Sequence, residues 1–336
     1  MFSYRSVKEA VCVWVGESSL TLVLTEISRR WVVQGTDRLV TRRAEPLDTL
    51  ANKNIVLLAR DGLISIGYTG NAYLGYPPIP TDCWMARKLA RDESLQDDGE
   101  GAIRIGDDRP WPDVGQALLG LCGELGTELS SRGSDRPGSF QVVAAGWQWK
   151  TEGKMWNLAR SRPIMWMLDH LGAPAYMRAS YMPRDWGWER NRLHLSAVPR
   201  SNISDQRGKD LINKLAQTGR ANESEDLVVD CLREISRENV VVGPHVMLTT
   251  IPHPLRSRMV HTRYVPSEQN TEEAGPAAFT PWVLTPSTVV APTMFSEELE
   301  VPVGPYTFVF EGPSEPIIGE DGSIYLFRSQ HRPEGS

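Results

Sequence analysis

The sequence predicts an α+β protein in which two antiparallel sheets carry helices on their outer sides. Runs of β-branched and aromatic residues form hairpin-like pairs near the N-terminus. Segments with helical spacing of leucines follow, and the blocks come in the order strands, helices, strands, helices, strands. A parallel sheet would need single strands and helices in strict alternation, so this block order favours antiparallel pairing.

The composition is that of an ordinary globular chain. Its 336 residues are 40% hydrophobic and 23% charged, which fits one large or two medium domains. The net charge of −6 argues against a nucleic-acid partner or an anionic membrane surface. Apolar runs are much shorter than the roughly 20 residues that cross a bilayer, and the N-terminus lacks a secretory pattern. Cys12, Cys83, Cys122 and Cys231 form no CxxC pair, which indicates free buried thiols and a cytoplasmic protein.

The N-terminal part of the chain predicts a leader and two hairpins. Residues 1–20 are interpreted as a leader that contains an extra strand. Ser28-Arg29 separates the strands of the first hairpin, and Asp61-Gly62 is typical of the two-residue turn of the second. The predicted strands are residues 11–15, 20–27, 30–36, 54–59 and 63–68.

Residues 21–255 are predicted to form the core, and the rest is predicted as an extension. Thr81 has the residue type and position of a helix N-cap. Residues 94–110 suit a surface loop, and residues 151–190 show no assignable pattern. The predicted helices are residues 81–93, 114–130, 208–218 and 223–238, and further strands are predicted at 140–149, 194–199 and 245–252. Residues 256–336 predict a Pro/Thr-rich extension with two late strands at 305–313 and 323–329.

Several short segments carry a resemblance to a known family. They are residues 21–24 (TLVL), 31–41 (WVVQGTDRLVT), 52–53 (NK), 68–70 (YTG), 81–84 (TDCW) and, more weakly, 242–247 (VGPHVM). Together they resemble the proteasome-subunit branch of the N-terminal-nucleophile (Ntn) hydrolase superfamily, and a group of uncharacterised bacterial proteins within it most closely. The resemblance implies a four-layer αββα sandwich, a homo-oligomer, and a peptide or other amide as substrate.

The resemblance also implies four site residues. Thr21 matches the nucleophile, whose own free α-amine serves as the base. Asp37 matches the acid that orients the site, and Lys53 matches the cation that holds down the pKa of nearby groups. Gly70 matches the glycine whose N–H helps to bind the oxyanion. The spacing agrees, because a strand, a turn and a return strand bring Asp37 back beside Thr21.

Three functions stay open on the sequence. Leu20 precedes Thr21, so a threonine-type amide hydrolase requires cleavage that exposes Thr21. A catalytically silent assembly or recognition subunit of the same fold is the second function. The third is an unrelated α+β ligand-binding protein with a stacking site made by the tryptophans at 147, 149, 156, 166, 186 and 188. We expect no cofactor and no metal, because the histidines form no HxxxH pair and no phosphate-loop or GxSxG motif is present.

Overall fold

A computed structural model of the chain gives an α+β fold, which confirms the predicted class. It describes residues 21–42, 45–48, 51–95, 103–105, 112–132, 140–152, 155–171, 176–182, 194–198, 203–257, 259–267, 281–285, 288–292, 306–310, 316–318 and 324–326. The predicted leader, with its strand at 11–15, lies outside these residues. The described helices are α1 (Thr81–Ala90), α2 (Val114–Ser131), α3 (Asp205–Leu215) and α4 (Ala221–Glu238).

Most strands belong to two eight-stranded sheets. The first sheet has the order β13 (His194–Val198), β1 (Val23–Ile27), β2 (Trp31–Asp37), β14 (Val246–Pro252), β15 (Met259–Val265), β18 (Tyr306–Phe310), β20 (Ile324–Leu326) and β19 (Pro316–Ile318). The second has the order β12 (Tyr176–Met182), β11 (Met155–Leu171), β10 (Gln141–Glu152), β6 (Gly62–Thr69), β5 (Asn54–Ala59), β16 (Trp282–Leu284), β17 (Thr288–Val290) and β9 (Ile103–Ile105). Two ribbons, β3 (Val40–Arg42) with β4 (Glu45–Asp48) and β7 (Tyr73–Leu74) with β8 (Ile79–Pro80), complete the described strands.

Strand pairing corrects the prediction of purely antiparallel sheets. Each sheet contains one parallel pair, β18 with β20 in the first and β5 with β16 in the second. Both pairs involve strands beyond residue 255, in the segment predicted as an extension. That segment supplies strands to both sheets, and four of them, β15, β16, β17 and β19, were not predicted. β16, β17 and β19 are three residues long, so they carry almost no periodic signal. β15 has seven residues that alternate between buried and less buried positions, and its strand pattern was missed.

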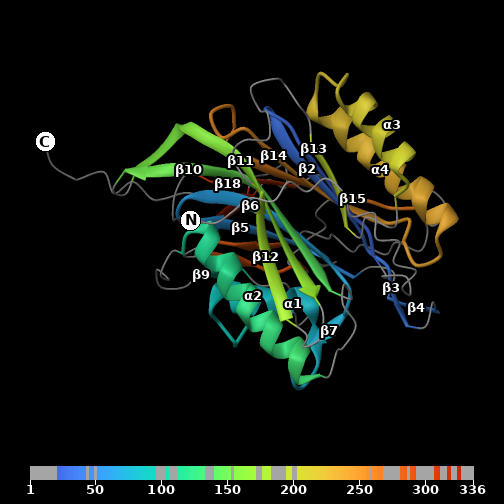
Figure 1. Cartoon of the computed structure of the whole chain (residues 1–336). Helices are drawn as coiled ribbons and strands as arrows, with labels where there is room; N and C mark the ends of the chain where they lie inside the picture. Colours follow the sequence, from blue (N-terminus) through green and yellow to red (C-terminus); the bar gives the residue numbers. More distant parts are fainter. Residues whose placement is uncertain are drawn as a thin grey trace, which may run out of the picture.

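Helices lie on the outer side of each sheet (Figure 1). Buried apolar side chains fill the space between the elements. α1 and α2 share a core cluster with β5, β6 and β10 of the second sheet. α3 and α4 share another with β1, β2 and β14 of the first sheet. A third cluster joins side chains of both sheets, among them Val23, Val56, Val143 and Trp147. The alternation of β1 explains this, because Val23 faces the second sheet while Leu22 and Leu24 face α4.

The predicted second hairpin is confirmed, but its two turn residues are Arg60 and Asp61, because Gly62 already pairs with Ala59. The turn also contacts the start of a helix. The Asp61 side chain accepts a hydrogen bond from the backbone N–H of Val114, the first residue of α2, at 2.8 Å. Its other carboxylate oxygen accepts from Gln148 Nε2 at 2.6 Å. A carboxylate at a helix N-terminus satisfies a backbone donor that lacks an intrahelical partner. The hairpin turn therefore caps α2 from another part of the chain.

The predicted N-cap at Thr81 is wrong. Pro80 occupies the cap position of α1, and Thr81 is already the first helical residue. The Thr81 hydroxyl instead donates to the carbonyl of Asn71 at 2.7 Å, across the ribbon of β7 and β8. A threonine before an apolar periodic run is ambiguous by one position, because its hydroxyl can satisfy a loop carbonyl as well as a helix N–H.

Residues 151–190, which showed no pattern in the sequence, contain β11 and β12. Pro163 lies inside the long strand β11 and pairs with Trp147 of β10. Pairing of β11 with β12 begins only at Met165, so Pro163 faces no second strand there among the described residues. A proline is tolerated at such a position because its missing N–H breaks no ladder hydrogen bond.

The tryptophans do not form one stacking site. Trp147 and Trp149 are buried in the cluster between the sheets, and Trp147 Nε1 donates to the carbonyl of Ile251 at 3.0 Å. Trp166 packs on the opposite face of the sheet, with its ring 4.9 Å from that of Tyr181. The side chains at 156, 186 and 188 lie outside the described part. Trp147 and Trp149 therefore fill the core between the sheets, and the described members of the set share no single stacking site.

Three of the predicted free thiols are confirmed. Cys83, Cys122 and Cys231 are buried and form no disulfide, while Cys12 lies outside the described residues. Within the described residues, no helix has the length and apolar character that crossing a bilayer would need. The predicted cytoplasmic location stays a prediction.

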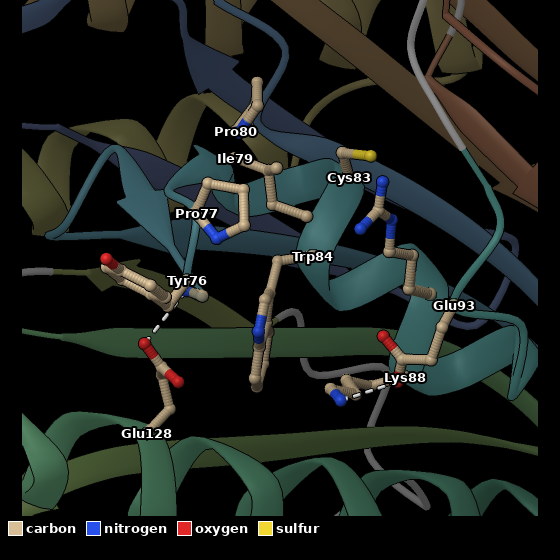
Figure 2. Close-up of a pocket in the computed structure, with 11 residues that line it drawn as sticks. Tyr76, Pro77, Ile79, Pro80, Cys83, Trp84, Lys88, Glu93 and Glu128 are labelled. Carbon is tan, nitrogen blue, oxygen red and sulfur yellow. Dashed lines mark hydrogen bonds and ion pairs between the residues drawn. The ribbon is translucent and has the colours of Figure 1, made fainter.

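A surface groove of about 630 Å³ lies beside α1 (Figure 2). Its walls include Tyr76, Pro77, Trp84 and Lys88, and Glu128 of α2 accepts a hydrogen bond from the Gly75 N–H at 2.9 Å. None of the four predicted site residues lines this groove. The candidate site therefore lies elsewhere, between the strand ends described below.

One buried carboxyl gives a testable pH dependence of stability. Glu26 on β1 is fully buried, and its carboxylate accepts from Trp31 Nε1 at 3.2 Å. Burial raises the pKa of Glu26 to about 7, against the opposing hydrogen bonds of Ser224 and Trp31. Because the folded-state pKa lies above the unfolded value, Glu26 favours folding fully below pH 4.5 and loses that contribution as the pH rises to 7.

Glu26→Gln is therefore expected to stabilise the protein at pH 8 by up to about 3 kcal/mol and to change little at pH 4.5. Urea unfolding at both pH values measures this. Glu234→Gln, at an exposed position of α4, is the matched control and should show no such difference. An equal effect of Glu26→Gln at both pH values would contradict the buried, neutral carboxyl.

Candidate functional site

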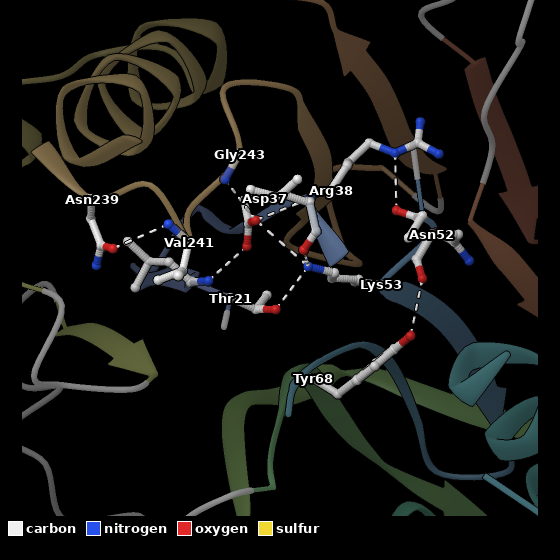
Figure 3. A network of polar contacts seen from close by, with 12 residues as sticks. Thr21, Asp37, Arg38, Asn52, Lys53, Tyr68, Asn239, Val241 and Gly243 are labelled. Carbon is white, nitrogen blue, oxygen red and sulfur yellow. Dashed lines mark hydrogen bonds and ion pairs between the residues drawn. The ribbon is translucent and has the colours of Figure 1, made fainter. Parts of the chain in front are cut away.

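Thr21, Asp37 and Lys53 meet at one end of β1, β2 and β5 (Figure 3). The antiparallel hairpin pairs Val23 with Thr36, which places the end of β2 beside the start of β1. Lys53 directly precedes β5 in the second sheet and reaches across to the first. The structure thus brings together three of the four predicted site residues.

Lys53 is the centre of this cluster. Its ammonium donates to Thr21 Oγ1 at 2.7 Å and to the carbonyl oxygen of Leu39. Its Nζ also lies 3.6 Å from Asp37 Oδ2 in an ion pair. Thr21, Asp37 and Lys53 are all at least 98% buried, with exposed fractions of 2%, 0% and 2%. In such a site water screens the charges little, so the ammonium acts strongly on the threonine oxygen.

Asp37 is held by backbone donors from three segments. Its Oδ1 accepts from the Leu22 N–H at 2.7 Å, and its Oδ2 accepts from Gly243 at 2.9 Å and from Leu39 at 3.2 Å. Burial raises the pKa of Asp37, while the ammonium of Lys53 and these three N–H groups act in the opposite direction. Donors on both oxygens suit the ionised carboxylate, which we take as the form that pairs with Lys53.

The segment before Lys53 is held by Arg38. Arg38 and Ala51 exchange two hydrogen bonds, since the Ala51 N–H donates to the Arg38 carbonyl and Arg38 Nε donates to the Ala51 carbonyl, each at 3.1 Å. The guanidinium lies over the Tyr264 ring, 5.1 Å from its centroid. Arg38 directly follows Asp37, so this exchange ties the two halves of the cluster together.

A polar network continues from the site into the layer between the sheets. Gln34 Nε2 donates to Thr25 Oγ1 at 3.1 Å, and Ser65 Oγ donates to Gln34 Oε1 at 2.7 Å. Asn54, next to Lys53, lies 3.5 Å from the same Gln34 oxygen through its Nδ2. Buried hydrogen bonds between β2, β5 and β6 favour one register of the two sheets near the site.

Gly70 follows β6 directly and has a φ of +117°, a conformation that only glycine adopts without strain. Among the described residues, Gly70 makes none of the contacts given above for Thr21, Asp37 and Lys53. Its role in binding an oxyanion stays a prediction.

Gly243 belongs to the site, although it was not among the four predicted site residues. Its N–H donates to Asp37 Oδ2, and the two residues are 206 positions apart in the sequence. A Cβ on Gly243 would lie 2.6 Å from Leu39 Cβ and 3.0 Å from the Leu39 backbone nitrogen, so only glycine fits. The Gly243-Pro244 pair after α4 was the available signal, but it indicates only a chain turn.

Gly243→Ala is expected to destabilise the fold by about 3 kcal/mol, because the added methyl group overlaps Leu39. It should also disturb Asp37, because the N–H groups of Leu39 and Gly243 both donate to its Oδ2. Thermal and urea unfolding measure the stability. Gly208→Ala in α3 is the matched control, since a Cβ there meets no atom within 4 Å, and it should stabilise by about 0.5–1 kcal/mol. A Gly243→Ala variant as stable as the wild type would contradict the close contact between position 243 and Leu39.

Comparison with protein-family models finds no match to this chain, and comparison with curated proteins finds none. Similar solved structures include an Anbu (Gly-1) mutant from Hyphomicrobium sp. strain MC1, at 14% identity and a TM-score of 0.42. They also include Anbu (ancestral beta-subunit) from Yersinia bercovieri, at 12% identity and a TM-score of 0.41. Each alignment covers 69% of this chain and 82% of the Anbu chain.

The predicted membership of an uncharacterised bacterial group of proteasome-type Ntn hydrolases is wrong on these findings. No family model supports it, and the two solved structures are Anbu chains at 14% and 12% identity. With TM-scores of 0.42 and 0.41, the likeness assigns this chain neither a family nor an activity.

The cluster has the parts for a nucleophilic hydroxyl but lacks a base in the uncut chain. Lys53 can stabilise negative charge on Thr21 Oγ1, and Asp37 keeps the ammonium in place. The Thr21 nitrogen is part of the peptide bond to Leu20, so it cannot accept a proton. Among the described residues, no group of three or more His, Cys, Asp or Glu side chains could hold a metal ion.

Proposed function

We propose that this chain is an amide hydrolase of the N-terminal-nucleophile type, in which Thr21 is the nucleophile after the Leu20–Thr21 bond is cut. The observation that carries the proposal is the 2.7 Å contact between the buried Lys53 ammonium and Thr21 Oγ1. A buried ammonium placed on a hydroxyl oxygen favours the charged form of that oxygen. The same contact would stabilise the negative charge that develops when the hydroxyl attacks a carbonyl.

Hydrolysis of the Leu20–Thr21 bond consumes one water and leaves Thr21 with a free α-amine. That amine takes the proton from Oγ1, and Oγ1 forms a bond to the carbonyl carbon of the substrate amide. The tetrahedral intermediate then expels the amine, which takes the proton back from the α-ammonium, and an ester on Thr21 remains. A second water hydrolyses the ester, which releases the acid and restores the hydroxyl.

The other predicted site residues have defined roles in this proposal. Asp37 fixes Lys53 through their ion pair and orients the start of β1 through the Leu22 N–H. The Gly70 N–H is the proposed donor to the oxyanion, because Gly70 directly follows β6, whose last residues lie beside the start of β5 next to Lys53. A peptide or another amide is the proposed substrate.

A four-layer αββα sandwich is the architecture that we propose for the chain around this site. Its support is the separation of the core into three clusters, one under α1 and α2, one between the sheets, and one under α3 and α4. In this arrangement the site lies where strands of both inner layers end. The fold alone would host many activities, so the function depends on the cluster at Thr21.

The test is to make the chain begin at Thr21 and to assay it. A cleavable partner fused directly before Thr21 releases the free amine, and intact mass confirms the new N-terminus. The released protein should hydrolyse at least one member of a panel of fluorogenic peptide amides, and a β-lactone probe should acylate the Thr21 peptide. A correctly cut, folded chain that neither hydrolyses nor takes up the probe would overturn the hydrolase and favour the silent subunit.

We also propose that the chain forms a homo-oligomer. Apolar side chains are exposed on the helix layer of the second sheet, including Leu119 of α2 at 54% and Tyr76 beside α1 at 100%. Light scattering at micromolar concentration is expected to give a multiple of the chain mass of 37.6 kDa. A mass of one chain across the accessible concentration range would refute the oligomer.

A further inference from the structure

The C-terminal part of the chain reaches the candidate site through Trp282. β16 joins the second sheet by parallel pairing with β5, and Trp282 lies opposite Ile55, two residues after Lys53. The Trp282 side chain is 1% exposed and belongs to the core cluster under α1 and α2. A segment that follows the predicted core in the sequence is therefore a direct neighbour of the strand that starts at the site.

Trp282 and the site share a carboxylate. Trp282 Nε1 donates to Asp82 Oδ2 at 3.0 Å, and Asn52 Nδ2 donates to the same oxygen at 3.0 Å. Asp82 is itself 97% buried in the first turn of α1, with an exposed fraction of 3%. A buried carboxylate is costly unless donors fix it, and here two side chains from distant segments do so.

Asn52, the residue before Lys53, passes this restraint to Asn54, the residue after it. Its Nδ2 also donates to the Asn54 carbonyl at 3.1 Å, and its Oδ1 accepts from the Asn54 N–H at 3.3 Å. Its backbone carbonyl accepts from the Tyr68 hydroxyl at 3.2 Å. These contacts bracket Lys53 on both sides along the chain. They limit the directions in which its side chain can leave the backbone.

We propose that Trp282 and Asp82 are positioning residues for Lys53, so that the C-terminal part of the chain completes the site. They act by holding Asn52, and through it the backbone that aims the ammonium at Oγ1. The catalytic consequence depends on the proposed hydrolase function, whereas the positioning of Lys53 does not.

The size of the effect follows from the geometry that catalysis requires. A displacement of about 1 Å of a catalytic group can cost up to about 100-fold in rate. Loss of the indole N–H removes the Trp282 donor from Asp82 Oδ2 and keeps the Asn52 donor, which loosens Asn52 without removing it. We therefore expect a decrease of about tenfold, within that limit.

The first experiment uses the full, uncut chain and the variant Trp282→Phe. Lysine acetylation is followed by mass spectrometry on the peptide that contains Lys53, which in the wild type is buried and expected to react slowly. Trp147→Phe is the matched control, because Trp147 is also 1% exposed and its Nε1 also makes a hydrogen bond of 3.0 Å. Trp147 pairs with Leu63, at the far end of β6 from the site.

The expected result is that Trp282→Phe raises the acetylation rate of Lys53 by about fivefold or more, in line with loss of a local restraint. Trp147→Phe should leave this rate within about twofold of the wild type, although it costs comparable stability. Equal rates in the two variants would overturn the positioning role. Asp82→Asn supplies a second variant with little change in volume, and it should also raise the rate.

The second experiment applies the same variants to the chain that begins at Thr21. Trp282→Phe should lower kcat about tenfold with KM within about twofold, because substrate binding does not involve it. Equal loss of kcat in Trp147→Phe would overturn the inference and leave the hydrolase intact. If no form of the chain hydrolyses an amide, but Trp282→Phe still raises the acetylation rate of Lys53 and Trp147→Phe does not, the proposed function fails. The positioning role of Trp282 then stands.

Discussion

Thr21→Ala is expected to abolish amide hydrolysis by the chain that begins at residue 21, with a loss of about 10³-fold or more. The substitution removes Oγ1, the oxygen that Lys53 contacts at 2.7 Å, and leaves the α-amine in place. Thr21→Ser keeps the hydroxyl and is expected to retain activity. The measurement is kcat/KM on the best amide of the fluorogenic panel.

Thr36→Val is the matched control for this loss. Thr36 is a buried threonine in the neighbouring strand, and its Oγ1 has no hydrogen-bond partner among the described residues. Valine has nearly the same shape, so this variant should keep both the fold and the activity. Full activity in Thr21→Ala would show that another group attacks the substrate.

Lys53→Met is expected to destabilise the fold by about 3–5 kcal/mol at pH 8 and to remove the hydrolase activity. Methionine fills a similar volume but leaves Asp37 buried without its cation. Removal of one partner of a buried ion pair costs much more than the pair contributes, because the remaining charge keeps its desolvation penalty. Urea unfolding measures the stability.

The destabilisation should depend on pH with a definite sign. Burial already raises the pKa of Asp37, and loss of the Lys53 ammonium removes the strongest opposing contact. A carboxyl with a raised folded-state pKa makes its full contribution to the free energy of unfolding below its unfolded pKa of about 3.9. That contribution is lost as the pH rises through the folded-state pKa. Lys53→Met should therefore be less destabilising at pH 5 than at pH 8.

Two further variants isolate the cause. Adding Asp37→Asn to Lys53→Met removes the uncompensated charge and should recover part of the stability at pH 8. Lys88→Met is the surface control, since Lys88 pairs with the exposed Glu93 at 2.6 Å, and it should change stability by less than about 1 kcal/mol. A Lys53→Met variant as stable as the Lys88→Met control would contradict the buried ion pair.

Local patterns predicted the hairpins well. β1 with β2 and β5 with β6 follow from runs of β-branched residues and from the Asp61-Gly62 turn signal, all of which act between residues close in sequence. Helices α1 to α4 were found for the same reason, with errors only at their ends. The start of α1 was misplaced because a single hydrogen bond, from Thr81 to Asn71, decides it.

The irregular segments could not be predicted in this way. β11 contains Pro163 and mixed polar and aromatic residues, so its assignment depends on its place beside β10. β16 is three residues long and forms by parallel pairing with β5. Such strands are stabilised by partners distant in sequence, and tertiary context overrides their weak intrinsic preference.

Local patterns were enough to predict the strand and helix blocks, the α+β class, and the placement of a threonine, an aspartate and a lysine at strand ends. The hydrogen bond of the Gly243 N–H to Asp37 and the sharing of Asp82 by Trp282 and Asn52 became visible only in the folded chain. Those contacts join residues 206 and 200 positions apart. They depend on the order of strands in the two sheets, and a periodic pattern along the chain reports only on neighbours within a few residues.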